Sequence, residues 1–277
     1  SPEQKYMIIE KLSQNFNTGF LGEGINDAPA LKIAGVSLAV QSASGIAREA
    51  ADILLLQKNL EVIINGILEG RAVFTNTIKY LKATLASNFG NFYAIALSTL
   101  FIDFLPMLPI QILMVNLLSD FPMISIATDN VAKKEVKEPQ KYNVKDVILI
   151  SIILGVVSTA FDFMFFGLFH KMSPETLQTN WFIGSILTEL IFLFSIRTKL
   201  PFYKAQAPSM PIIFLTTIAA IITIILPFLN FGKNIFHFSA PSSIHLMWIF
   251  GLVFAFFISS EIFKVSYYKY FQKVDSR

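Results

Sequence analysis

The sequence contains no cysteine, and only 15% of its 277 residues are charged. The absence of cysteine excludes disulfide bonds and thiolate metal sites. The net charge of +3 is too small to indicate a nucleic-acid-binding surface. Hydrophobic residues make up 54% of the chain, and its mean hydropathy of +0.59 lies above the usual range for a water-soluble domain. Most of the chain is therefore expected to lie in a lipid bilayer.

Six apolar segments follow residue 80 and are each candidates to cross a membrane. A bilayer core of about 30 Å is crossed by roughly 20 helical residues. The fourth segment is the shortest. The predicted fold is an α-helical membrane protein with six transmembrane helices, at Ala83–Ile102, Phe104–Ala127, Val147–Phe169, Trp181–Ile196, Met210–Phe231 and Ile244–Phe263.

Basic residues are distributed unequally between the connections of these spans. One set of alternate connections holds only Lys171 and Lys233. The other set holds twelve, which are Lys133, Lys134, Lys137, Lys141, Lys145, Arg197, Lys199, Lys204, Lys264, Lys269, Lys273 and Arg277. Because basic loops stay on the cytoplasmic side, both chain ends are predicted to be cytoplasmic, in a multi-pass protein of the cell membrane.

Residues 1–60 instead alternate helices with short apolar strands, which is typical of an α/β domain with a parallel, doubly wound sheet. So few residues cannot complete such a sheet, so further strands are expected before Ser1 or in another chain. Residues 61–82 are predicted to form a stalk helix that leads into the membrane domain, residues 83–277. The predicted helices are Ser1–Asn15, Pro29–Ala34 and Gly45–Ala51, and the predicted strands are Thr18–Leu21, Val36–Val40 and Ile53–Leu56.

The loop after the first predicted strand carries the most specific motif, Gly22-Glu23-Gly24-Ile25-Asn26-Asp27-Ala28-Pro29-Ala30-Leu31. Its glycines allow a sharp turn, and the carboxylates of Glu23 and Asp27 are hard oxygen ligands of the kind that Mg²⁺ prefers. Lys5 could supply a compensating positive charge. The alternative is an acidic glycine-rich turn with a surface lysine.

This run resembles the hinge motif T-G-D-G-x-N-D-A-P-A-L of P-type ATPases, and Ser1-Pro2-Glu3-Gln4-Lys5 resembles the lysine-bearing segment upstream of it. The resemblance implies a haloacid-dehalogenase-like phosphorylation domain. It implies catalytic roles for Lys5, Glu23, Asn26 and Asp27, with Lys5 on the aspartyl phosphate and the two acids organising catalytic Mg²⁺. Glu23 stands where the family has aspartate, and its extra methylene should disturb a near-octahedral Mg²⁺ shell.

Three parts of that family are absent from this sequence: the D-K-T-G-T nucleophile motif, the nucleotide-binding domain and the T-G-E loop. The chain is therefore expected to use ATP only together with the missing domains, from the same or another polypeptide. The alternative is a non-enzymatic membrane protein that binds cations or another membrane subunit.

Polar residues within the first two spans form a second pattern. Asn88 and Asn91 lie three residues apart in the first span, and Asn116 and Asp120 lie four apart in the second. Each pair therefore shares a helix face, and a carboxylate in lipid is a candidate functional group. Pro122 frees backbone carbonyls nearby, which are further ligands for a hard cation. The alternative is a set of interhelical hydrogen bonds.

These segments resemble the fifth and sixth membrane helices of magnesium-transporting P-type ATPases. The resemblance implies that Asn91, Asn116 and Asp120 bind the transported cation, with the family's fourth helix absent from this chain. Calcium pumps prefer glutamate at the position of Asn91, so Ca²⁺ or H⁺ remains an alternative ion. Asp162 and Glu189 are expected mainly to stabilise contacts between helices.

Overall fold

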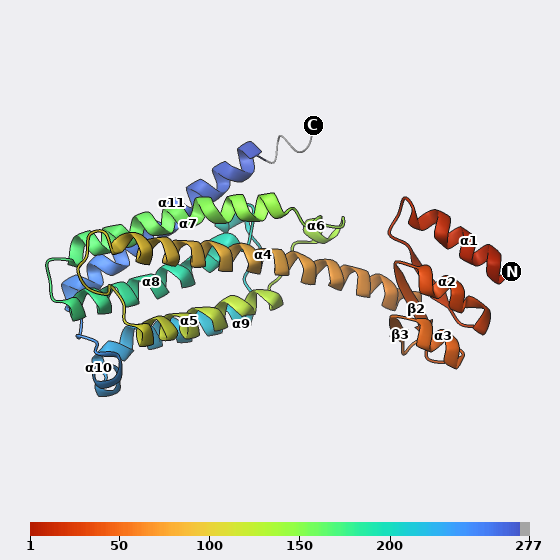
Figure 1. Cartoon of the computed structure of the whole chain (residues 1–277), viewed down its shortest axis with the longest axis horizontal. Coiled ribbons are helices and arrows are strands. Elements are labelled where there is room, and N and C mark those ends of the chain that lie inside the picture. The colour runs from red at the N-terminus through yellow and green to blue at the C-terminus, as the bar shows by residue number, and fades with distance from the viewer. Residues whose placement is uncertain (272–277) are drawn as a thin grey trace. The chain divides into compact units, whose positions relative to one another are not determined.

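The computed structural model describes residues 1–271 and divides into two compact units, Ser1–Glu69 and Gly70–Arg277. Lys273 and Arg277, which enter the charge count above, lie outside the described residues. The helices and strands are shown in Figure 1.

The first unit is an α/β layer with a parallel sheet in the order β1-β2-β3. Gly19 pairs with Val36, and Leu38 pairs with Ile53. The three strands and their parallel direction were predicted, and each predicted helix and strand lies within two residues of its predicted bounds, while the short element η1 was not predicted. The elements are α1 (Pro2–Ser13), β1 (Gly19–Gly22), η1 (Ile25–Asp27), α2 (Ala28–Ile33), β2 (Val36–Val40), α3 (Gly45–Ala50) and β3 (Ile53–Leu55).

Local sequence explains where these helices begin. Ser1 caps α1 by accepting a hydrogen bond from the Gln4 backbone, and Pro2 occupies the first helical position. Ser44 caps α3 in the same way through the Ala47 backbone. A small apolar core, which includes Leu31, Leu38 and Leu55, packs α2 and α3 on the sheet.

The second unit is a helical bundle. Helix α4 (Leu60–Ser98) begins in the first unit and continues into the second, so the predicted stalk and first span form one helix. The other elements are α5 (Pro109–Ile124), η2 (Ser125–Thr128), α6 (Lys133–Val136), α7 (Val144–Phe169), α8 (Pro174–Ile196), η3 (Phe202–Lys204), α9 (Met210–Ile225), η4 (Leu226–Phe228), α10 (Asn230–Phe236) and α11 (Ser243–Phe271).

Five helices within the described residues are long and apolar enough to cross a membrane: Pro109–Thr128, Val144–Phe169, Pro174–Ile196, Met210–Phe228 and Ser243–Phe271. Helix α4 is not among them, although it contains most of the first predicted span, Ala83–Ile102. Asn88 and Asn91 make this part of α4 more polar than the other spans. The chain is thus an α-helical membrane protein in which five of the six predicted spans meet the test of length and hydropathy.

Helix α8 is the centre of the bundle, and the predicted fourth span was too short. It begins at Pro174 behind the Ser173 cap, not at Trp181, and 89% of its apolar window is buried. It contacts α5, α7, α9 and α11. Its first two turns look polar in sequence, but Gln178 and Asn180 are buried, and Gln178 donates to the Leu105 carbonyl at 2.8 Å.

The fifth predicted span, Met210–Phe231, was too long. Helix α9 ends at Ile225, and the chain continues through the short elements η4 and α10. Pro227 explains the end of α9, because proline lacks the amide hydrogen that a continuing helix would need.

Close packing of α4 on α7 fixes the position of the polar residues in α4. A Cβ atom at Gly90 would lie 2.8 Å from Ser158 Cβ, and one at Gly155 would lie 2.9 Å from Phe89 Cβ. Thr159 Oγ1 also donates to the Gly90 carbonyl at 3.3 Å. Small residues of this kind let membrane helices approach closely, so Asn91 is held at a fixed place next to α8.

Candidate functional site

Asp27 is the fixed acid of the loop after β1. Its Oδ2 accepts hydrogen bonds of 3.0 Å from the backbone amides of Glu23 and Gly24. Gly22 is needed for this turn, because a Cβ atom there would lie 2.9 Å from Asp27 Cβ and 3.0 Å from Leu31 Cδ1. The sequence thus folds the loop tightly around one buried carboxylate.

Lys5 of α1 lies against the same carboxylate. Its Nζ donates to Asp27 Oδ1 at 2.6 Å. The Lys5 ammonium and then the two backbone amides lower the pKa of Asp27 to about 2, although burial opposes the shift. Asp27 is therefore ionised at neutral pH, and the predicted association of Lys5 with the acidic loop is present.

The other two predicted catalytic residues, Glu23 and Asn26, are exposed. The Glu23 carboxylate accepts a hydrogen bond of 2.8 Å from Lys58 Nζ. Within the described residues, no group of three or more His, Cys, Asp or Glu could hold a metal ion. The donor set, one fixed and one exposed carboxylate, fits a Mg²⁺ ion that takes further oxygens from phosphate or water, not a protein-only cage.

In the membrane unit, Asn91 of α4 meets Glu189 of α8. Asn91 Nδ2 donates to Glu189 Oε1 at 2.7 Å, and Ser185 Oγ donates to Asn91 Oδ1 at 3.5 Å. Glu189 is only 8% exposed. A buried carboxylate in this setting needs compensating partners, and an amide alone supplies none of the opposite charge.

Hydroxyl groups lie around the Glu189 carboxylate, and a small cavity opens beside it. Ser87 of α4 and Ser119 of α5 lie beside its carboxylate. A cavity of about 10 Å³ opens next to it, lined also by Ser87 and Ser158. That volume is near the minimum that holds one water molecule. Three helices therefore contribute oxygen atoms around one buried acid.

Asn116 and Asp120 do not join this hydrogen-bonded group. Both are exposed on α5, and neither side chain makes a hydrogen bond or ion pair with the described residues. Ser119, between them in sequence, is buried and faces Glu189. Asp120 is near enough to interact electrostatically with Glu189. Asn91 thus contacts Glu189, while Asn116 and Asp120 lie on the exposed face of α5.

Asp162 has the structural surroundings expected of a helix contact. Its Oδ1 accepts a hydrogen bond of 2.8 Å from the Trp181 indole, which joins α7 to α8. Its Oδ2 is buried and has no hydrogen-bond partner among residues 1–271. Glu189 likewise joins two helices, but its surroundings are richer in oxygen atoms. Ser185 and Glu189 are four residues apart, so they share one face of a helix. This spacing is the sequence signal that could have indicated the polar group around Glu189.

Comparisons with known proteins show which family the chain resembles. Residues 104–266 match the family described as "Cation transporting ATPase, C-terminus". The chain is 37% identical over 276 residues to "Magnesium-transporting ATPase, P-type 1" of Escherichia coli (strain K12), and 36% identical to a protein of that name from Salmonella typhimurium (strain 14028s / SGSC 2262). Each alignment covers 96% of this chain and 30% of the relative.

The chain is also similar to a relative that is named for another ion. The "Calcium-transporting ATPase" of Bacillus subtilis (strain 168) is 32% identical over 72% of this chain and 24% of its own length. In all three relatives the matching region is part of one longer chain, so nothing found supports a separate polypeptide partner. The chain belongs to the P-type cation-transporting ATPases, and it corresponds to the C-terminal part of their magnesium-transporting members.

Proposed function

We propose that this chain is the C-terminal module of an ATP-driven cation transporter and that the transported ion is Mg²⁺. The observation that carries the proposal is the contact of Asn91 in α4 with the buried Glu189 in α8, bordered by Ser87 and Ser119. A buried carboxylate with amide and hydroxyl neighbours is suited to bind a cation that keeps part of its water shell.

Asp120 and Asn116 extend this site on the exposed face of α5. They lie one helical turn apart, and Asp120 is electrostatically coupled to Glu189. An ion near Glu189 would gain a second carboxylate from Asp120 as it approached along that face. The proposed ligands are therefore Asn91, Asn116 and Asp120, as the sequence predicts, together with Glu189.

Amide groups favour Mg²⁺ over the alternative ions. A proton pump needs a carboxylate that titrates and has little use for neutral amides, and Ca²⁺ takes six to eight oxygen ligands with its water largely removed. Asn91 and Asn116 add oxygen atoms without adding charge. The names of two of the relatives agree with Mg²⁺, while the Bacillus relative is named for calcium.

The loop of Lys5, Glu23, Asn26 and Asp27 would serve a phosphorylation domain of haloacid-dehalogenase type. Asp27 is ionised and held by two backbone amides, so it could position catalytic Mg²⁺, and Lys5 could neutralise a phosphate group at the same edge of the sheet. The bound Mg²⁺ would supply charge neutralisation for phosphoryl transfer. Glu23 would have to leave Lys58 before it could take part.

The proposed topology has six spans with both ends cytoplasmic. The first span would be the part of α4 that begins at Ala83, in which Ser87 and Asn91 lie beside Glu189. The domain division would be 1–60 for the phosphorylation-domain portion, 61–82 for the stalk and 83–277 for the membrane domain. The basic residues of the α6 region and of the segment after α8 would face the cytoplasm.

Phosphoenzyme formation tests the ATP-driven part of this proposal. The chain alone should form no acid-stable phosphoenzyme from radioactive ATP, because it contains no nucleophile motif. A chimera that joins the upstream region of the Escherichia coli relative to this chain should form one and should accumulate Mg²⁺. If the chimera inserts in the membrane and is phosphorylated but moves no cation, the non-enzymatic cation-binding alternative gains support.

A further inference from the structure

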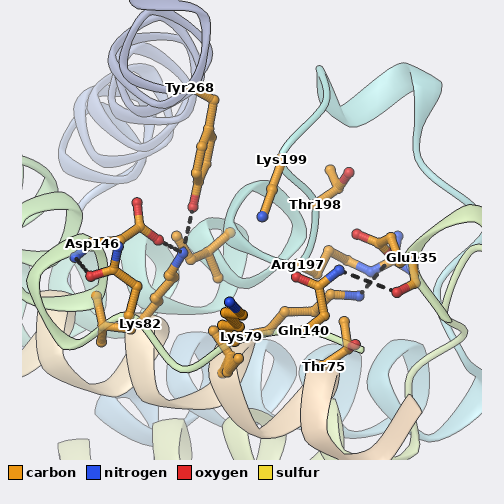
Figure 2. A pocket seen from close by; sticks show the side chains of 15 residues that line it. Thr75, Lys79, Lys82, Glu135, Gln140, Asp146, Arg197, Thr198, Lys199 and Tyr268 are labelled. Carbon is orange, nitrogen blue, oxygen red and sulfur yellow. Dashed lines mark hydrogen bonds and ion pairs between the residues drawn. The ribbon is translucent and has the colours of Figure 1, made fainter. Parts of the chain in front are cut away.

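A basic pocket opens at the end of the bundle where the lysine-rich segments lie (Figure 2). Its volume is about 100 Å³, and it lies between α4, the segment around α6 and the start of α7, the end of α8 and the end of α11. Among the groups that line it are Lys79, Lys82, Lys141, Arg197, Lys199 and Tyr268. None of these residues belongs to the proposed cation site.

Three of the basic groups already have acidic partners. Lys82 Nζ lies 2.6 Å from Asp146 Oδ2, and Lys79 Nζ lies 3.5 Å from Glu135 Oε2. Arg197 is paired with the buried Asp129, which accepts two hydrogen bonds of 2.8 Å from its guanidinium.

Two further ammonium groups of the pocket lining have no acidic ion-pair partner among the described residues. Within residues 1–271, no carboxylate lies within ion-pair distance of Lys141 or Lys199. Lys199 points into the pocket near Tyr268, as Figure 2 shows, and its Nζ lies 5.9 Å from the Tyr268 ring centroid. The pocket lining therefore has an excess of positive charge.

Partial burial of the ammonium groups makes this excess of positive charge unfavourable, because the charges lose contact with water. Much of the Lys199 side chain remains exposed, yet partial burial of its ammonium lowers its pKa. The positive charge of Lys82 lowers it further, while the carboxylates of Asp146 and Glu135 oppose the change. Burial also lowers the pKa of Lys79, although Glu135 and Asp129 oppose the change. An anion in the pocket would supply the missing negative charge and stabilise the ammonium form of both lysines.

We propose that this pocket binds a phosphate group chiefly through Lys199, with the ion-paired Lys79 and Lys82 adding positive charge beside it. A phosphate offers several oxygen acceptors to converging ammonium groups, which a single carboxylate cannot match. Tyr268 and Thr198 place hydroxyl groups in the same lining. The phosphate could be that of an anionic phospholipid or of a soluble phosphate compound, since the chemistry that recognises the two is the same.

Acylation of Lys199 provides a direct test with the intact chain. The purified, delipidated protein in a mild detergent is treated with an amine-reactive acetylating reagent, and modification of each lysine is measured by peptide mass spectrometry. The probes are inorganic phosphate, dihexanoyl-phosphatidylglycerol and, as the zwitterionic control, dihexanoyl-phosphatidylcholine. Lys204 is an exposed lysine in the same segment that does not line the pocket, so it reports general shielding.

A saturating phosphate probe should slow acetylation of Lys199 by about fivefold or more and leave Lys204 nearly unchanged. Protection by inorganic phosphate would identify a soluble phosphate as sufficient, and protection by phosphatidylglycerol alone would identify a lipid headgroup. The proposal is overturned if neither probe protects Lys199 selectively, or if phosphatidylcholine protects it equally well.

A pair of variants gives a second measurement that does not depend on acylation. Lys199→Gln keeps most of the side-chain length at an exposed position and removes the charge, and Lys204→Gln is the matched control. The rise in Tm that the phosphate probe causes should be largely lost in Lys199→Gln and retained in Lys204→Gln. An equal rise in both variants would contradict the proposal.

Discussion

Lys5 Nζ lies 2.6 Å from Asp27 Oδ1, so an ion pair joins helix α1 to the loop after β1. The pKa of Asp27 is lowered to about 2, from an ordinary value of 3.8. Its ionised form is thus favoured in the folded state. The resulting stability is fully present above about pH 4 and is lost as the pH falls toward 2.

Replacement of Lys5 by Met should weaken the first unit at neutral pH by about 1 kcal/mol, because half of the Lys5 side chain is exposed and water screens the pair. Hydrogen exchange of the Gly24 amide, which donates to Asp27, measures the loss. The difference from the unchanged protein should shrink as the pH approaches 2. Lys11→Met, on the exposed surface of the same helix, is the control and should have little effect.

Gly22→Ala should destabilise the first unit by roughly 1–3 kcal/mol, because the new methyl group would press against Asp27 and Leu31. Gly45→Ala is the matched control, since nothing lies within 4 Å of a Cβ atom there. Protection of the β1 and β2 amides from hydrogen exchange should fall in the first variant only. Equal protection in the two variants would show that the loop tolerates the added atom.

Arg197→Met should lower the stability of the membrane unit by about 3–5 kcal/mol, because it leaves the Asp129 carboxylate buried without its charged partner. The double variant Arg197→Met with Asp129→Leu should be more stable than the single one. Thermal unfolding in detergent compares the two proteins. A double variant that is less stable than Arg197→Met would contradict this account of the pair.

The topology can be read from single cysteines, since the chain contains none of its own. Lys171→Cys, before α8, should react with a membrane-impermeant thiol reagent added to intact cells. Lys137→Cys, after α6, should react only after the membrane is opened, because the basic connections are predicted to be cytoplasmic. Labelling of Lys137→Cys in intact cells would refute the predicted orientation.

Local patterns predicted the first unit well and the helix contacts poorly. The strands Gly19–Gly22 and Val36–Val40 follow from short apolar runs between turn residues. The start of α8 was missed because Gln178 and Asn180 look like loop residues, although both are buried. Their partners, Leu105 and His245, are distant in sequence, so no local pattern could indicate that burial.

For the candidate cation site, too, the sequence identified residues but not the contacts between helices. Sequence spacing identified Asn91 and Asp120 as polar residues within spans, but not which helix each would face. Glu189 lies 98 residues after Asn91, and their contact depends on how α4 packs on α7 and α8. Close approach at Gly90 and Gly155 fixes that packing, and it could be recognised only in three dimensions.

The proposed Mg²⁺ site is tested most directly by cation uptake in the chimera with the upstream region of the Escherichia coli relative. Asp120→Asn and Glu189→Gln each remove one proposed ligand charge, while Asp162→Asn removes a carboxylate bonded to Trp181 and serves as the control. Mg²⁺ uptake at equal protein levels should fall below about a tenth in the first two variants and stay above about half in Asp162→Asn. Uptake that survives both Asp120→Asn and Glu189→Gln unchanged would contradict the assignment of the site.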